Sequence, residues 1–195
     1  MAVFLRRLSR WQAEQQREAV ADLYAAAYRG APGGRSRDRQ EFLHRFEQHG
    51  QHDGFDMAVA DEGGLVGCAY VFRLGRGLDA WAGVPSDVLP GAEELASSGR
   101  VFALAELMVL PAYRRQGVAT RLAELMLYRL AADLVVARVE DRAGDGFREL
   151  LRAWGWKELS GPDGTDAPDG ASGPAGPAGS SGAAGTEVWA RVPQR

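Results

Sequence analysis

Short runs of apolar residues, separated by polar and glycine-rich stretches, predict the strands of one sheet. Between the second and third runs the sequence reads Asp61-Glu62-Gly63-Gly64, which is turn chemistry for a hairpin. The run that precedes Pro111 is strongly apolar and predicts a buried strand. The expected strands span residues 3–8, 55–60, 65–74, 102–110, 134–139, 156–159 and 187–192.

Apolar residues at helical spacing predict helices between these strands. In the second helix Phe42, Leu43 and Phe46 share one face, and Ser36 or Asp38 can cap its start. The third helix lies between the fourth and fifth strands, so these two strands should run parallel with a right-handed crossover. The expected helices span residues 12–29, a segment that ends near residue 50, residues 118–132 and residues 147–154.

Two segments show neither the residue pattern of a strand nor that of a helix. Residues 75–100 are rich in glycine and proline, and we expect an insertion there with a helical turn at residues 92–96. Residues 160–185 contain only Gly, Pro, Ala, Ser, Asp and Thr, so we expect a disordered loop that buries no core. A long loop costs little extra closure entropy, so the last two strands can still pair. The 195 residues, 46% of them hydrophobic, fit a single domain over 1–195.

Composition narrows the class of protein. The formal net charge of -3, from 23 basic and 26 acidic residues, leaves no basic excess for nucleic acid. The single cysteine, Cys68, cannot form an internal disulfide, and the spacing of histidine and cysteine suggests no metal site. No apolar run follows the arginine-containing start, so we expect no signal peptide, no transmembrane helix and a cytoplasmic location. Abundant alanine and glycine, with Lys157 the single lysine, indicate a bacterial source.

Residues 106–120 carry the most informative motif, a buried strand that leads through a basic, glycine-containing loop into a helix. The first turn of a helix offers unpaired backbone N–H groups and the positive end of the helix dipole, a site suited to a diphosphate. Gly117 lets a ligand approach, Ala119 keeps the helix start open and Thr120 adds a hydroxyl donor. Arg114 and Arg115 can donate charged hydrogen bonds to phosphate oxygens. The motif therefore predicts a phosphate cradle from Arg114 to Thr120.

The spacing Arg-x-x-Gly-x-Ala in residues 114–119 resembles the coenzyme A loop of the GNAT acetyltransferases, whose pattern is Arg/Gln-x-x-Gly-x-Gly/Ala. Gly155 and Trp156 resemble the Gly-Phe at the start of the family's sixth strand, and the order of elements over most of the chain is that of the family. No Gly-Lys-Ser/Thr follows the loop and the glycines of a dinucleotide fingerprint are missing, so these two nucleotide-binding motifs are excluded.

The resemblance implies the α/β (α+β) GNAT fold, a mixed twisted sheet of about seven strands with about four flanking helices and splayed fourth and fifth strands. It implies acetyl-CoA as co-substrate, with the backbone of Leu107, Met108 and Val109 contacting the pantetheine arm. The acceptor would enter near residues 30–37 and near the last hairpin. The residues expected to hold the pyrophosphate are Arg115, Gln116, Gly117, Val118, Ala119 and Thr120.

Glu106 is the candidate general base. An alkyl ammonium loses its proton only near about pH 10, so amine acetylation benefits from a base. Glu106 lies in an otherwise apolar strand, where desolvation raises a carboxyl pKa, and it matches a glutamate that many GNAT enzymes carry at this place. The alternative is a structural carboxylate that bonds to a neighbouring loop.

The acid that protonates the leaving thiolate is missing from its usual place. The family often has a tyrosine four residues before its Gly-Phe, and here that position is Leu151. Tyr113 lies close to the phosphate loop, while Tyr70 and Tyr128 can be plain packing residues. Cys68 has no histidine nearby in sequence, so we expect an inert buried thiol rather than an acetylated nucleophile.

The sequence predicts an N-acetyltransferase that moves an acetyl group from acetyl-CoA to a primary amine by direct attack in a ternary complex. A small molecule, a peptide N-terminus and a lysine all remain open as acceptor. Two alternatives are a non-catalytic coenzyme A-binding regulatory module and an acyltransferase with a longer acyl donor. We expect no metal, nucleic acid or membrane partner, and a monomer or a homodimer.

Overall fold

Seven strands form one mixed sheet in the computed structural model, which describes residues 2–29, 39–75, 91–128, 130–140, 145–160 and 186–192. The strand order is β1-β2-β3-β4-β5-β7-β6, and all neighbours are antiparallel except β4 and β5. The predicted seven strands and the parallel crossover are confirmed. The strands are β1 (Phe4–Leu8), β2 (Asp56–Asp61), β3 (Leu65–Arg73), β4 (Val101–Val109), β5 (Leu134–Glu140), β6 (Lys157–Ser160) and β7 (Thr186–Arg191).

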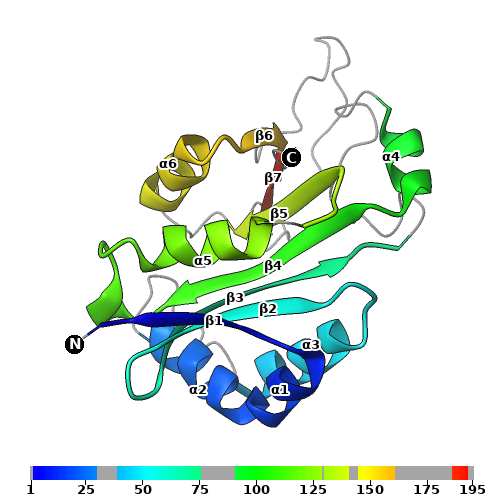
Figure 1. Ribbon diagram of the computed structural model, residues 1–195. Coiled ribbons are helices and arrows are strands. Elements are labelled where there is room, and N and C mark those ends of the chain that lie inside the picture. Colours follow the sequence, from blue (N-terminus) through cyan, green and yellow to red (C-terminus); the bar gives the residue numbers. More distant parts are fainter. Residues whose placement is uncertain are drawn as a thin grey trace, which may run out of the picture.

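Helices cover both faces of this sheet. In Figure 1, α1, α2 and α3 lie on one face and α5 lies on the other. The described residues contain six α-helices: the four predicted helices are present, the first of them split in two, and α4 lies where a helical turn was expected at residues 92–96. The helices are α1 (Arg10–Gln15), α2 (Arg17–Ala27), α3 (Arg39–Gly50), α4 (Ala92–Ser98), α5 (Val118–Leu127) and α6 (Asp145–Ala153), with a 3-10 turn η2 (Pro111–Tyr113).

The first predicted helix is in fact two helices. Ser9 begins α1 with a capping box, in which its hydroxyl accepts from the backbone of Gln12 and the Gln12 side chain accepts from the backbone of Ser9. The helical path is interrupted at Gln16, where φ is -103° and ψ is 7°. No glycine or proline marks this break, and the apolar period continues across it, so the sequence pattern predicted one helix.

The helix after the basic loop ends at Leu127 rather than at residue 132. The guanidinium of Arg7 in β1 donates to the carbonyl oxygens of Leu125 and Tyr128, and it forms an ion pair with Asp56 at 2.5 Å. Carbonyl groups at a helix C-terminus have no partner within the helix, and Arg7 supplies one. A contact from a distant strand therefore stabilises this helix end.

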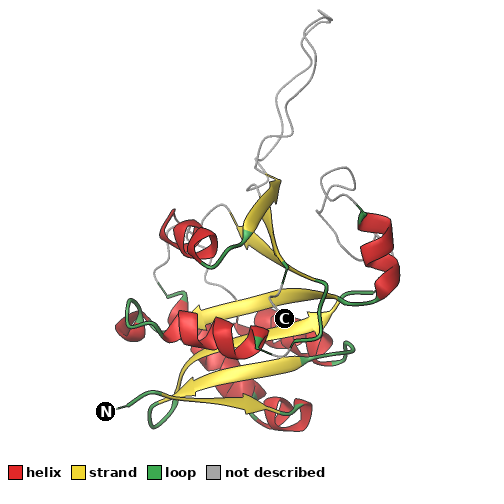
Figure 2. Ribbon diagram, turned by 45° about the horizontal axis from the view of Figure 1, so that its top comes forward, coloured by secondary structure: helices red, strands yellow, loops and turns green. Residues whose placement is uncertain are grey.

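Apolar side chains pack on both sides of the sheet, and Figure 2 shows the helices on either side of the strands. The core under α5 and α6 includes Leu122, Met126, Leu151, Trp156 and Trp189. Gly67 of β3 allows α5 to approach, because a Cβ there would lie 3.1 Å from the carbonyl oxygen of Met108 and 3.2 Å from Leu122 Cδ1. The core under α1, α2 and α3 includes Val20, Leu23, Tyr24, Phe42, Phe46, Met57, Val59, Cys68, Tyr70 and Met108.

A buried ion pair attaches α6 to β7. The Nε of Arg148 lies 2.8 and 2.9 Å from the two carboxylate oxygens of Glu187, and the indole of Trp189 donates to the same carboxylate at 3.0 Å. The hydrogen bond from Arg148 outweighs the opposing effect of burial, and with the bond from Trp189 it lowers the pKa of Glu187. Both partners are nearly inaccessible to solvent, so this contact fixes α6 beside β5 and β7.

Several expectations lie outside the described residues. They concern the cap at Ser36 or Asp38, the acceptor loop at residues 30–37, residues 76–90 of the expected insertion and residues 161–185 of the expected loop. The pairing of β6 with β7 on either side of the last segment confirms the expected hairpin strands. Within the described residues, no helix has both the length and the apolar character that a membrane span requires.

Candidate functional site

The strands β4 and β5 pair only over their first halves. Parallel pairing joins Val101–Leu104 to Leu134–Ala137 and stops there, although β4 continues to Val109 and β5 to Glu140. Figure 1 shows the two strands separating toward their C-terminal ends. The predicted splay is therefore present, and residues 105–109 of β4 have no strand partner on the β5 side among the described residues.

A β-bulge lies where the unpaired stretch begins. Tyr70 pairs with Glu106 whereas Val71 pairs with Leu104, so Ala105 is an extra residue on β4. Bulges end regular pairing and redirect side chains. Residues that oppose each other in a sheet share a face, and Tyr70 lies in the core under α1, α2 and α3. The side chain of Glu106 therefore points toward these helices.

The predicted cradle contains two residues with left-handed backbone. Arg115 has a φ of 62° and is the one non-glycine residue with positive φ in the described part of the chain, and Gly117 has a φ of 73°. Gly117 is the N-cap of α5 and contributes no side-chain cap. A Cβ built on it would meet nothing within 4 Å. The first N–H groups of α5 therefore lie at an open surface without a side-chain acceptor, as in anion-binding helix N-termini.

The two arginines of the motif have different surroundings. The Nε of Arg114 donates to the carbonyl oxygen of Val109 at 3.1 Å, and its Nη2 donates to that of Ala27 at 2.5 Å. These bonds tie the loop to the ends of β4 and α2. Arg115 reaches toward the first turn of α6, since its Nη1 lies 4.0 Å from the place of a Cβ on Gly146. The guanidinium of Arg114 thus holds the loop in shape, whereas that of Arg115 extends toward α6.

Glu106 meets polar groups from two helices. The hydroxyl of Tyr28, just after α2, donates to Oε1 at 2.8 Å. The Nη2 of Arg45, on α3, lies 3.7 Å from Oε2, and the Glu106 side chain is 10% exposed. The carboxylate is therefore nearly buried, is held by a phenol and faces a cation, and these two contacts come from the end of α2 and from α3.

Arg45 packs among aromatic rings. Its guanidinium carbon lies 5.7 Å from the ring centroid of Tyr24 and 5.4 Å from that of Phe42. Burial acts to lower the pKa of Arg45, but the hydrogen bond to Tyr24 and the negative charge of Glu106 outweigh it and raise that pKa. Arg45 therefore stays charged beside the candidate base.

A second polar chain continues from Arg45 along α3. The hydroxyl of Tyr70 lies 3.2 Å from Nδ1 of His49, and the charge of Arg45 influences the pKa of both groups. Whether Tyr70 or His49 donates in this contact depends on the tautomer of His49. Burial, followed by the charges of Arg45 and His52, lowers the pKa of His49 to about 4. Burial and then Glu106 raise the pKa of Tyr70 well above its usual value, so this phenol is a poor proton donor.

Four further residues were considered for the chemistry: Leu151, Tyr113, Tyr128 and Cys68. Leu151 is 0% exposed, so an apolar core side chain occupies the position of the family's tyrosine. Glu62 of the β2-β3 turn raises the pKa of Tyr113, and the Tyr128 side chain is 61% exposed. Cys68 is fully buried, and burial followed by the charge of Glu106 raises the pKa of its thiol, in keeping with the expected inert cysteine.

Tyr28 and Arg45 are the site residues that sequence reasoning missed. Their separation from Glu106 along the chain follows no motif, and each also reads as an ordinary residue of an amphipathic helix. A polar residue between the buried Phe42 and Phe46 was the one available signal for Arg45. Within the described residues, no cluster of three or more His, Cys, Asp or Glu side chains could hold a metal ion.

Comparisons with known proteins agree on the fold. The structure is similar to that of an acetyltransferase of the GNAT family from Staphylococcus aureus. The superposition covers 99% of this chain and 100% of that one, with 14% sequence identity and a TM-score of 0.61. A phosphinothricin acetyltransferase from Sinorhizobium meliloti in complex with acetyl-CoA is 17% identical, with a TM-score of 0.59 over 98% of this chain and 89% of that one. A GNAT family acetyltransferase from Brucella melitensis in complex with acetyl-CoA is 20% identical, with a TM-score of 0.53 over 80% of this chain and 83% of that one.

The match to a family is independent of these structures. No curated protein matched the chain. The model of the acetyltransferase (GNAT) family matches residues 17–143, which are well over half of the 195 residues and include the cradle, Glu106 and the splayed strands. The chain therefore belongs to the GNAT acetyltransferase family.

Proposed function

We propose that the protein is an N-acetyltransferase that moves the acetyl group of acetyl-CoA to a primary amine by direct attack in a ternary complex. The observation that supports this most is the opening of β4 away from β5 beside the uncapped start of α5, with Glu106 on the open part of β4. In order along the chain, these features would serve as a base, as a strand edge for the pantetheine arm and as an anion site. The composition favours a cytoplasmic bacterial protein.

The residues present fit the pantetheine and pyrophosphate groups of acetyl-CoA. When bound, acetyl-CoA would supply an activated thioester carbonyl. Leu107, Met108 and Val109 lie on the open strand edge, where an extended amide chain can pair with backbone groups as an added strand does. Arg114 would act by holding the loop, since both of its contacts are to protein carbonyls. The groups proposed for the pyrophosphate are those of Arg115, Gln116, Gly117, Val118, Ala119 and Thr120.

Glu106 would accept the proton that the amine loses as its nitrogen bonds to the thioester carbonyl carbon and the carbon–sulfur bond breaks. Tyr28 and Arg45 hold this carboxylate in one position. The leaving sulfur would take its proton from solvent, because Leu151 offers none and Tyr70 is held protonated. Loss of a dedicated acid should slow the transfer more than abolish it, because a thiolate is a fair leaving group.

Release of free coenzyme A in the presence of a panel of amines tests the proposal. The panel contains small amines, peptides with a free N-terminus and peptides with an internal lysine. Acetyl-CoA binding without release on any amine would favour the second candidate, a coenzyme A-binding regulatory module, for which the buried Leu151 is the supporting observation. The same assay with longer acyl donors distinguishes an acyltransferase of different chain-length preference.

A further inference from the structure

Arg45 has hydrogen-bond donors left over beside the candidate base. A guanidinium carries five N–H donors. Arg45 lies over the rings of Tyr24 and Phe42, and its distance of 3.7 Å from Glu106 is too long for a good hydrogen bond. Its side chain is nevertheless 38% exposed. The Arg45 side chain is therefore contacted by aromatic rings and lies near Glu106, and it is partly open to solvent.

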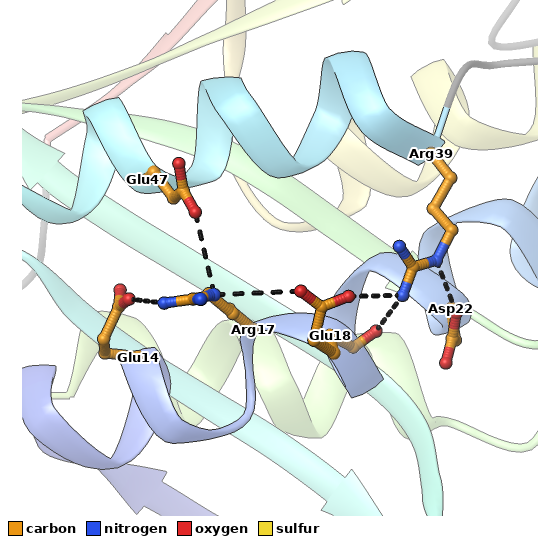
Figure 3. A network of polar contacts seen from close by, with 6 residues as sticks. All are labelled: Glu14, Arg17, Glu18, Asp22, Arg39 and Glu47. Carbon is orange, nitrogen blue, oxygen red and sulfur yellow. Dashed lines mark hydrogen bonds and ion pairs between the residues drawn. The ribbon is translucent and has the colours of Figure 1, made fainter.

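Two other arginines, Arg17 at the start of α2 and Arg39 at the start of α3, contrast with Arg45. Figure 3 shows that Arg17 is surrounded by Glu14, Glu18 and Glu47, and that Arg39 is bound by Glu18 and Asp22. The Nη2 and Nε of Arg39 lie 2.7 and 2.6 Å from their carboxylate partners. Each of these arginines has at least two carboxylates, whereas Arg45 has one carboxylate partner, at 3.7 Å, among the described residues. The charge of Arg45 is thus the least compensated of the three.

We propose that Arg45 determines acceptor specificity by binding a carboxylate of the acceptor, so that the preferred substrate is an amine with an adjacent carboxylate, as in an amino acid. This inference rests on the proposed function. The acceptor's amine would lie at Glu106 and its carboxylate at Arg45, so the two charges of a zwitterion match the two charges of the protein. A charge-assisted bond from a guanidinium that aromatic rings hold in place costs little side-chain entropy.

Matched pairs of amino acids and their amides test the proposal in the wild-type protein. The two members of a pair share the side chain and the amine, and only the acid has the carboxylate. At saturating acetyl-CoA, kcat/KM should be about tenfold or more higher for the acid. The intrinsic chemistry works in the opposite direction, because the amine of an amide is less basic and a larger fraction of it is neutral at pH 7. A preference for the acid therefore cannot come from amine reactivity.

The variant Arg45→Gln should reduce the ratio of kcat/KM for an acid to kcat/KM for its amide by about tenfold or more, whereas any effect of the variant on Glu106 should lower both members of a pair equally. Arg45→Lys should restore part of the preference, because it keeps the charge and loses the fork of donors. Arg39→Gln is the matched control, since it removes an arginine from the same helix whose carboxylates are all on the protein surface. Arg39→Gln should leave kcat/KM unchanged for both the acids and the amides.

Three outcomes distinguish the possibilities. Equal or higher kcat/KM for amides in the wild type overturns this inference and leaves the proposed function intact. An equal loss for acids and amides in Arg45→Gln, with acetyl-CoA affinity retained, overturns it in favour of a purely positioning role for Arg45 at Glu106. No transfer to any amine overturns the proposed function itself. If Arg45→Gln fails to fold, the wild-type comparison of acids with amides decides.

Discussion

The contacts of Glu106 show how one residue depends on distant parts of the chain. Its strand supplies an apolar setting, while Tyr28 and Arg45 supply the polar groups from two helices on the same face of the sheet. A fixed, nearly buried carboxylate beside the open strand edge is the geometry that a general base needs. The same contacts would also suit a structural carboxylate, so substitution has to separate the two roles.

Glu106→Gln keeps the shape of the side chain and removes its ability to take a proton. If Glu106 is the base, turnover should fall about 100-fold or more while acetyl-CoA affinity stays nearly unchanged. Steady-state kinetics together with calorimetric titration of acetyl-CoA measure both quantities. Glu124→Gln, at an exposed position of α5, is the control and should be neutral. Loss of folding or of cofactor binding along with activity would instead assign Glu106 a structural role.

Glu187 permits a prediction about acid stability at the same scale. Because the folded state lowers the pKa of Glu187, its contribution to stability is complete above the unfolded value of about 4.3 and is lost as pH falls through the folded value. Glu187→Gln should therefore reduce the free energy of unfolding by about 3 kcal/mol at pH 7, and the difference from wild type should shrink below about pH 4. Urea unfolding at pH 7, 5 and 3.5 measures it.

Glu158→Gln is the matched control for this ion pair. Glu158 lies 3.6 Å from Arg152, but both side chains are more exposed, at 35% and 57%. Exposed pairs contribute about 0 to 1 kcal/mol, so this variant should change stability little at any of these pH values. A pH-independent difference for Glu187→Gln would mean that packing, and not the charge of Glu187, attaches α6 to β7.

At the scale of elements, the candidate site lies where the end of β4 is close to the start of α5. The strand β4 leaves β5 after Leu104, and the loop from Pro111 to Gly117 turns the chain so that α5 begins beside that opening. Arg114 fixes the loop to β4 and to α2 at once. The proposed anion site and the open strand edge are thereby connected through one fixed loop.

The left-handed Gly117 gives a direct test of this arrangement. Gly117→Asp should weaken acetyl-CoA binding at least tenfold, because a carboxylate at the start of α5 repels the pyrophosphate. Gly117→Asn is the matched control, since asparagine has nearly the same shape and tolerates this backbone conformation without the charge. Calorimetric titration of both variants measures the difference. Equal affinities for the Asp and Asn variants and the wild type would show that the pyrophosphate lies elsewhere.

At the scale of the whole molecule, the sheet joins two parts through the half-paired strands β4 and β5. The part from β1 to β4 carries Glu106 and its helix partners, and the part formed by β5, β7 and β6 carries α6. Antiparallel pairing of β6 with β7 closes the second part. Its ends, Ser160 and Thr186, flank residues 161–185, whose composition offers no apolar area for a core.

Replacing residues 161–185 with an Asn-Gly turn should leave the melting temperature equal or slightly higher, and acetyl-CoA affinity unchanged. A shorter connection closes the β6-β7 hairpin at a smaller entropic cost. Thermal unfolding and calorimetry measure these two quantities. A changed KM for the amine, with cofactor affinity retained, would indicate that the segment contacts the acceptor, whereas collapse of folding would show that it packs in a defined structure.

The amino-acid sequence by itself determined the seven strands and the parallel crossover, because local periodicity specifies them. The phosphate cradle stays a prediction from one short motif. The sequence also indicated Glu106, as a charge within an apolar strand. Tertiary structure decided the rest. The break at Gln16, the early end of α5 at Arg7 and the contacts of Tyr28 and Arg45 with Glu106 all depend on side chains far apart in sequence. Such contacts form only when the helices pack on the sheet, so the local sequence pattern does not predict them.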